Sequence, residues 1–294
     1  MVRRKIADGD MILRRQTTLA GNLAIEGIGV HSGKPARLDL RPAAAGTGIC
    51  FVDASGQGRI RVRPETVAST DLSTLIGDPA GFHVSTVEHL MSALAGSGID
   101  NVEIAISGTE VPILDGSAVE FVTAFKSAGT VEQDQPVAAI RVVAPVRVEN
   151  GAAWAEFVPH ERPRFEIEID FPSPAIGRQQ IAFDLEPDTY ASEVAPARTF
   201  GFMRDVERLW AAGLALGSSL ENSVVIGEDD IVVNPGGLRF ADEFVRHKAL
   251  DAVGDLAIGG VAIIGCYRSF RGGHKLNAAA LAALLARPDA FERL

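Results

Sequence analysis

Cysteine is scarce in this sequence: Cys50 and Cys266 are the only two among 294 residues. Two distant thiols cannot form a disulfide framework or complete a cysteine-rich zinc site, and they fit a reducing, cytoplasmic setting. The sequence also lacks a glycine-rich phosphate loop and a dinucleotide-binding fingerprint. These absences argue against a P-loop nucleotide hydrolase and against a nicotinamide-dependent enzyme.

Basic residues are outnumbered by acidic ones. The chain has 28 lysines and arginines against 38 aspartates and glutamates, which gives a formal net charge of -10. General nucleic-acid binding requires clustered lysine and arginine, so we expect no nucleic-acid partner. A small anionic ligand would have to bind through a local basic patch.

Long apolar runs are absent as well. The basic N-terminus is not followed by an apolar segment of signal-peptide length, and we expect residues 1–14 to form a flexible extension. The longest apolar run, Leu256 to Tyr267, is too short and too rich in glycine to span a bilayer. We therefore expect neither a secretory signal nor a transmembrane segment.

The hydrophobic content of 47% is ample for a folded core. Each half of the chain has short strands, a histidine-bearing helix, a glycine and then an apolar strand, which predicts an α+β fold of two similar domains, each a sheet layered with helices. The polar stretch 132–136 is interpreted as the linker between domains 1–135 and 136–294. Strands are predicted at 37–41, 60–62, 101–106, 140–148, 154–158, 165–170 and 260–267, and helices at 87–98, 119–127, 203–212, 242–257 and 277–286.

The predicted helix 242–257 places His247, Lys248, Asp251 and Asp255 within an arc of about 100°. A histidine and an aspartate four residues apart can both reach one metal ion. The same spacing is typical of a His–Asp pair on a solvated helix face. The helix by itself leaves both interpretations open.

Glu88 and His89 lie in the first turn of the other histidine-bearing helix. His89 is a candidate third ligand, and Glu88 is a candidate general base beside it. Glu88 also has the spacing to complete a capping box with Ser85. The two interpretations of Glu88 have similar weight at this point.

His274 follows two glycines in a predicted loop and is flanked by Arg271 and Lys275. A histidine in this setting suits a general acid, and the alternative is an ordinary surface histidine. Thr199, before Phe200 and Gly201, could offer a hydroxyl to an oxyanion. The remaining histidines, at positions 31, 83 and 160, show no usable pattern.

Four segments in order, STVEHLMSALAGSGIDN, EVPILDGSA, ARTFGFMRD and DEFVRHKALDAVGDL, resemble the UDP-3-O-acyl-N-acetylglucosamine deacetylase family. The resemblance implies a cytoplasmic, monomeric hydrolase of lipid A biosynthesis that uses Zn²⁺ to deacetylate a small UDP-sugar, with the active site between two domains. It implies zinc ligands at His89, His247 and Asp251. It further implies Glu88 as base, His274 as acid, Asp255 as its orienting carboxylate, Lys248 and Thr199 near the amide, and Phe200 beside the sugar.

For the rest of the substrate, the resemblance implies an apolar acyl-chain passage in the second domain and cations for the diphosphate. We expect the passage wall to include Leu209, Trp210, Leu214 and Leu216, and the cations to be Arg271 and Lys275. Two positions depart from the family pattern. Ser73 replaces a cysteine that some members have near the metal, and Ala153 replaces a lysine near the nucleotide.

Two other functions use a similar set of residues. Two histidines and one carboxylate also form the Fe(II) site of mononuclear oxygenases, and Fe²⁺ could replace zinc in the hydrolase itself. A non-catalytic nucleotide-sugar-binding protein with a structural metal would need a closed site with four ligands. The sequence offers three candidate ligands together with an acid–base pair, which favours the hydrolase.

Overall fold

The computed structural model describes residues 14–294, and the fold is given for this part of the chain. The predicted extension lies outside the described residues except for Arg14, which donates two hydrogen bonds to the carboxylate of Asp100. Among the helices of the described part, none has the length and apolar character needed to cross a bilayer.

A five-stranded sheet forms one layer of the molecule, in the order β2-β3-β9-β4-β5. Leu38 and Leu40 on β3 are fully buried while their neighbours are not, as the alternating pattern predicts. β4 runs parallel to β9, and the other pairs are antiparallel. The strands are β2 (Leu23–Ile28), β3 (Pro35–Pro42), β4 (Ile49–Asp53), β5 (Arg59–Arg61) and β9 (Val102–Ser107).

The stretch interpreted as a linker is a strand. β10 (Thr130–Pro136) pairs antiparallel with β1 (Arg15–Leu19), and Gln133 bonds the carbonyl of Ala43. The polar side chains of β10 are compatible with an exposed two-stranded ribbon, so the polarity of this stretch did not distinguish a strand from a loop. A small three-stranded sheet follows the chain order β6 (Val67–Ser69), β7 (Leu75–Gly77) and β8 (His83–Val84).

The second large sheet is centred on β18 (Ala262–Phe270), which pairs antiparallel with β13 and parallel with β11 and β14. The strand predicted over 140–148 is divided in two, because Pro145 has no amide hydrogen and the amide of Val143 bonds Ala290 instead. The other strands are β11 (Ala139–Val142), β12 (Val146–Asn150), β13 (Ala153–Val158), β14 (Pro163–Asp170), β15 (Arg178–Asp184) and β19 (Phe291–Arg293).

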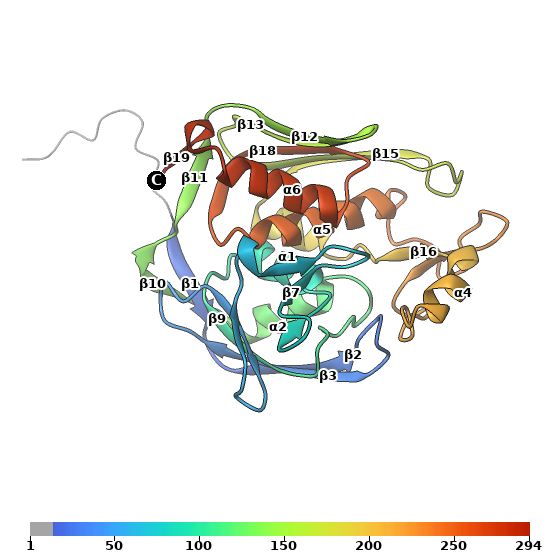
Figure 1. The fold of residues 1–294 in the computed structure, drawn as a ribbon, viewed down its shortest axis with the longest axis horizontal. Coiled ribbons are helices and arrows are strands. Elements are labelled where there is room, and N and C mark those ends of the chain that lie inside the picture. The colour runs from blue at the N-terminus through green and yellow to red at the C-terminus, as the bar shows by residue number, and fades with distance from the viewer. Residues whose placement is uncertain (1–13) are drawn as a thin grey trace, which may run out of the picture.

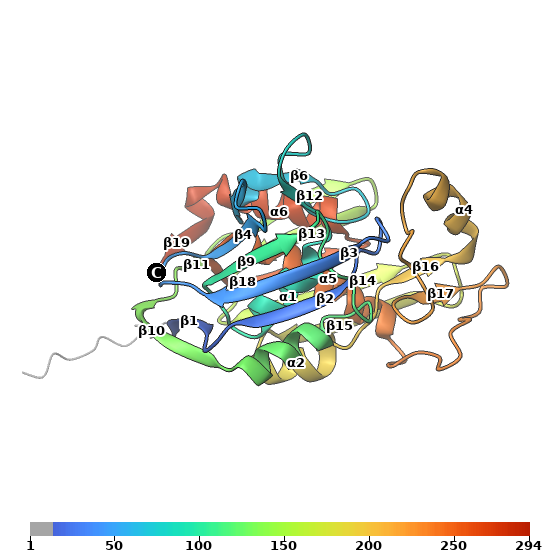
Figure 2. The same cartoon turned by 90° about the horizontal axis from the view of Figure 1, so that it is seen from below.

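The main helices lie between the two large sheets, with α1, α5 and α6 side by side (Figure 1). Seen from below, β2, β3 and β9 cover the same helices (Figure 2). The helices are α1 (Glu88–Gly96), α2 (Val119–Ala128), α3 (Pro187–Thr189), α4 (Met203–Ala211), α5 (Glu243–Ala257) and α6 (His274–Leu285), with single turns at Pro64–Thr66, Tyr190–Val194 and Pro288–Ala290. This arrangement confirms the predicted α+β class of sheets layered with helices.

α1 and α5 cross closely in the middle of this layer. An added Cβ at Gly254 on α5 would lie 2.0 Å from the carbonyl oxygen of Glu88 on α1, so the contact requires a glycine. A further unit, β16 (Phe200–Phe202), α4 and β17 (Val224–Ile226), projects from one end of the layers (Figure 1). The domain boundary at 135/136 stays a prediction.

Candidate metal and acid–base site

Three buried side chains meet where the first turn of α1 faces the middle of α5. They are His89, His247 and Asp251, and each offers a ligand atom within 4.8 Å of the others. Oδ1 of Asp251 lies 3.4 Å from Nε2 of His247 and 3.7 Å from Nε2 of His89. The interpretation of His247 and Asp251 as a pair on a solvated face of α5 is therefore wrong, because each of these two residues is only 2% exposed.

The bonding around this cluster leaves polar atoms free. Nδ1 of His247 is 3.0 Å from the carbonyl of Ala197, and Lys248 donates from Nζ to Oδ2 of Asp251 at 2.7 Å. Within residues 14–294, Nδ1 of His89 and Oδ1 of Asp251 are buried without a hydrogen-bond partner. An orphaned carboxylate oxygen is costly unless a ligand satisfies it, and a cation bound between Oδ1 of Asp251 and the Nε2 atoms of the two histidines would do so.

The electrostatics favour metal-binding protonation states. Burial and the neighbouring His247 lower the pKa of His89 to about 3, and burial also lowers the pKa of His247. Burial alone would raise the pKa of Asp251, but Lys248 and His247 hold it well below its usual range. Two neutral imidazoles and one carboxylate are the forms that ligate a divalent cation.

Glu88 lies beside the cluster in a nearly sealed position, 3% exposed. Its Oε2 accepts a hydrogen bond from the amide of Thr74 at 3.0 Å, and burial raises its pKa to about 7. The capping-box interpretation is wrong, since Glu88 is the first residue of α1 and Ser85 donates its hydroxyl to Thr109 instead.

His274 is the first residue of α6 rather than part of a loop, and its side chain is 11% exposed. Its Nδ1 lies 2.9 Å from Oδ2 of Asp255, and its Nε2 lies 3.7 Å from Oε1 of Glu88. Burial would lower the pKa of His274, but Asp255 and Glu88 outweigh that effect and raise it to about 10. The imidazolium form is therefore stabilised next to a carboxylate that is ready to take a proton.

Lys248 and Phe200 lie at the border of this site, and Thr199 directly precedes Phe200. The Phe200 ring is 5.5 Å from Nζ of Lys248 and 6.2 Å from the His247 ring. Thr199 is fixed by its backbone, which donates to Gly116 and accepts from Val224. The structure therefore brings Lys248 and Phe200 to the edge of the metal cluster.

The predicted wall residues lie on α4 and the turn after it, in the projecting unit. Leu209 and Leu214 are half-buried, whereas Trp210 is 54% and Leu216 is 52% exposed. The Trp210 indole donates to Ala215, and the Leu216 amide donates to His31. The second of these bonds joins the unit to the first half of the chain, but neither defines a passage.

The two predicted phosphate-binding cations differ in their surroundings. Arg271 forms an ion pair with Asp170 at 2.6 Å, so its charge is already compensated. Lys275 is exposed on the first turn of α6. Ser73 is buried next to Thr74, and Ala153 begins β13.

Four residues near the site were missed by the sequence interpretation. His31 lies close enough to His274 for their charges to interact. Thr74, Asn277 and Tyr267 form hydrogen bonds around Asp255, described below. No local spacing marks them, because Thr74 and Asp255 are 181 positions apart in the chain.

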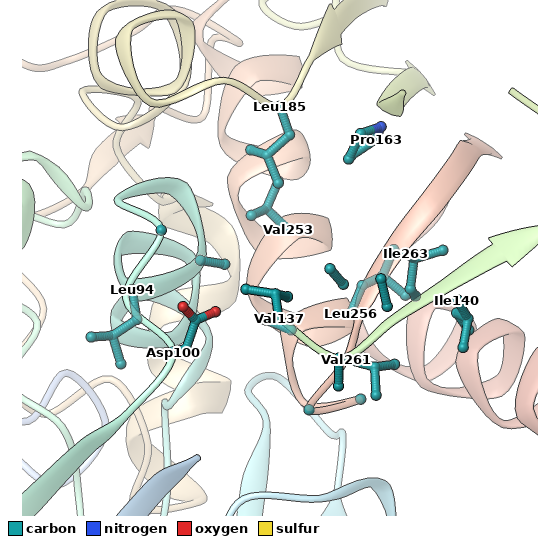
Figure 3. Close-up of a pocket in the computed structure, with 18 of the residues that line it drawn as sticks. Leu94, Asp100, Val137, Ile140, Pro163, Leu185, Val253, Leu256, Val261 and Ile263 are labelled. Carbon is teal, nitrogen blue, oxygen red and sulfur yellow. The ribbon is translucent and has the colours of Figure 1, made fainter. Parts of the chain in front are cut away.

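A cavity of about 1120 Å³ lies away from this chemistry, at the C-terminal ends of α1 and α5. Apolar side chains point into it, including Leu94, Val137 and Leu256 (Figure 3). Of the residues described at and around the site, Tyr267 alone also lines this cavity. The cavity therefore lies at the opposite end of α1 from the candidate site.

Comparison with known proteins agrees with the resemblance seen in the sequence. The model of the UDP-3-O-acyl N-acetylglycosamine deacetylase family matches residues 16–286. The UDP-3-O-acyl-N-acetylglucosamine deacetylases of Brucella ovis and Brucella canis are each 52% identical to this chain over 279 residues, which cover 94% of this chain and 97% of each relative. The enzyme of Brucella melitensis biotype 2 is 51% identical over the same lengths. The chain belongs to the UDP-3-O-acyl N-acetylglycosamine deacetylase family.

Proposed function

We propose that this protein hydrolyses the acetamide of a UDP-3-O-acyl-N-acetylglucosamine, releasing acetate and the free amine, in the pathway to lipid A. The observation that carries the proposal is a buried His–His–Asp cluster beside a carboxylate and a carboxylate-paired histidine, in a chain of the deacetylase family. Amide hydrolysis needs an activated water, a stabilised oxyanion and an acid for the leaving nitrogen. The site offers a group for each requirement.

The metal ligands we propose are His89, His247 and Asp251. The orphaned Oδ1 of Asp251, which faces Nε2 of both histidines, supports this assignment, as does the neutral state of both imidazoles. Two histidines and a carboxylate suit Zn²⁺, and Fe²⁺ is a chemically reasonable substitute. When bound, such a cation polarises the amide carbonyl and acidifies water.

The residues of the chain then perform the proton transfers. Glu88 takes a proton from the attacking water, whose oxygen bonds the carbonyl carbon. Lys248 and Thr199 stabilise the oxygen that becomes negative. As the carbon–nitrogen bond breaks, His274 gives its proton to the amine, and Asp255 keeps the imidazolium in place. Acetate leaves with the oxygen from water.

The remainder of the substrate extends from this centre. We propose that Phe200 packs beside the sugar, and that Leu209, Trp210, Leu214 and Leu216 contact the acyl chain. We further propose that Lys275 and Arg271 attract the diphosphate, with Lys275 the stronger contributor because Arg271 is already paired with Asp170. We propose a cytoplasmic monomer with domains 1–135 and 136–294.

An acetate-release assay on the UDP-sugar substrate, with and without a chelator, tests the proposal. We expect turnover that the chelator abolishes and added Zn²⁺ restores. Oxygen-dependent turnover would instead support an Fe(II) oxygenase, a reaction that leaves the Glu88 and His274–Asp255 groups without a role. Tight nucleotide-sugar binding without acetate release would support a non-catalytic binding protein.

A further inference from the structure

We propose that Thr74 is a positioning residue that links the base and the acid of this site, holding Glu88 with its backbone and Asp255 with its hydroxyl. The inference rests on the proposed function for the roles of these two carboxylates. The geometry itself does not depend on that function. Thr74 immediately precedes β7 and is buried, with 1% of its surface exposed.

Thr74 uses each of its polar groups on the two helices that form the site. Its amide donates to Oε2 of Glu88 at 3.0 Å, and its carbonyl accepts from the amide of Val87 at 3.3 Å. Its hydroxyl donates to Oδ1 of Asp255 at 2.7 Å. The first two bonds fix the N-terminus of α1, and the third reaches α5. A single residue thus fixes the separation of two carboxylates from distant parts of the chain.

Asp255 receives its other bonds on the opposite oxygen. Oδ2 accepts from Nδ2 of Asn277 at 2.8 Å and lies 2.9 Å from Nδ1 of His274. The amide of Asn277 cannot turn over, because its Oδ1 accepts from the hydroxyl of Tyr267 at 2.6 Å. The carboxylate is therefore held at both oxygens, by Thr74 on one side and by the Tyr267–Asn277 pair on the other.

A carboxylate fixed in this way determines where the His274 imidazole points. With Nδ1 bound to Asp255, Nε2 lies 3.7 Å from Oε1 of Glu88. The acid and the base then face the same point in the site. If the Thr74 hydroxyl is lost, Oδ1 of Asp255 is left buried with one donor fewer, and the carboxylate can rotate about its remaining bonds. The imidazole would follow, and proton delivery to the leaving nitrogen would become slower.

Thr74→Val tests this, because valine keeps the shape and the backbone amide but removes the hydroxyl. In the full-length zinc-loaded protein we expect kcat for acetate release to fall about 10- to 100-fold, the usual effect of losing an outer partner of a site. We expect KM and bound zinc to be unchanged. Thr74→Ser restores the hydroxyl and should recover most of kcat. A purely structural role for Thr74 predicts that serine, which leaves a small gap, rescues no better than valine.

A matched control is Thr18→Val. Thr18 is another buried threonine whose hydroxyl donates to a carbonyl, that of Asn101, but it lies on β1 outside the site. We expect this variant to lose thermal stability and keep the kcat of the original chain. If Thr74→Val does not fold, Tyr267→Phe frees the Asn277 amide on the other side of the same carboxylate, and kcat should fall while KM stays constant.

A second measurement does not depend on turnover. In ¹⁵N-histidine-labelled, zinc-loaded protein, the Nδ1 proton of His274 should give a downfield resonance that Thr74→Val shifts or broadens and Thr18→Val does not. Unchanged kcat together with an unchanged resonance in a folded Thr74→Val protein would overturn the proposal. If the original chain released no acetate, the proposed function would fail, and the resonance alone would decide whether Thr74 positions the pair.

Discussion

The centre of the molecule and the projecting unit are built on opposite principles. In the centre, α5 is buried along most of its length, and its charged side chains are held by specific partners such as Lys248 on Asp251 and Thr74 on Asp255. In the projecting unit, α4 has no buried residue and carries the half-exposed Trp210. The centre is suited to chemistry that requires fixed atoms.

Under the proposed function, we expect the centre to carry out the reaction and the projecting unit to bind the acyl chain. A proton transfer becomes much slower when the reacting groups move by an ångström, and the side chains that we propose as catalytic lie on helices packed between sheets. An acyl chain needs only apolar area, which an exposed amphipathic helix can supply by adjusting its side chains. Changes in the centre should therefore affect kcat, and changes in the projecting unit should affect KM.

The largest effect is expected for His247→Ala. The variant removes one of three proposed ligands, so we expect both bound metal and acetate release to be lost. Metal analysis of the purified protein together with the activity assay checks this. Retention of one equivalent of zinc would show that His247 is not a ligand.

Glu88→Ala should have the next largest effect. Loss of a positioned general base typically costs about 10²- to 10⁴-fold in rate. Because Glu88 is not a proposed ligand, metal content and thermal stability should remain close to those of the original chain. Acetate release at a normal rate by metal-loaded Glu88→Ala would exclude the role of this residue as the base.

The pH dependence of kcat/KM should follow from Glu88 and His274, the two groups of the centre whose pKa values are raised. Glu88 must be ionised to take a proton, so kcat/KM should rise as pH increases through its pKa of about 7. His274 must be protonated to give one, so kcat/KM should fall as pH increases through its pKa of about 10. A bound cation lowers both values, because positive charge favours the deprotonated forms.

A matched variant makes the pH experiment more specific. His274→Gln should leave a slower enzyme whose rate no longer falls at high pH, while the rise through the pKa of Glu88 remains. A bell-shaped profile that persists unchanged in His274→Gln would assign the alkaline limb to another group.

The smallest effect is expected for Trp210→Ala in the projecting unit. Removing an exposed apolar contact should raise KM for a long-chain substrate by about tenfold or less, the result of losing roughly 1.4 kcal/mol of binding, with kcat unchanged. A substrate with a short acyl chain serves as the control, since it should lose less. A fall in kcat with constant KM would contradict the proposed division between the two regions.

The sequence predicted those features that depend on periodicity along one element. The 3.6-residue repeat placed His247 and Asp251 together on α5, and alternation placed Leu38 and Leu40 on the buried face of β3. His89 needed motif context, because it comes from another helix in the other half of the chain. Periodicity within one helix carries no information about which helix packs against it.

Other features could not be read from local patterns. β10 was interpreted as a linker because an exposed ribbon strand has the composition of a loop. His274 was placed in a loop because the two glycines before it conceal the start of α6. Thr74 remained unnoticed because its importance lies in bonds to residues 14 and 181 positions away, which only the packed structure brings together.

We propose above that one catalytic cation is held by His89, His247 and Asp251. Anomalous diffraction at the zinc absorption edge, from crystals of the protein purified without added metal, tests it most directly. We expect one strong peak within bonding distance of all three side chains, and a weaker zinc signal with a matching iron signal if Fe²⁺ shares the site. A peak at other residues, or full catalytic activity in crystals without any peak, would contradict it.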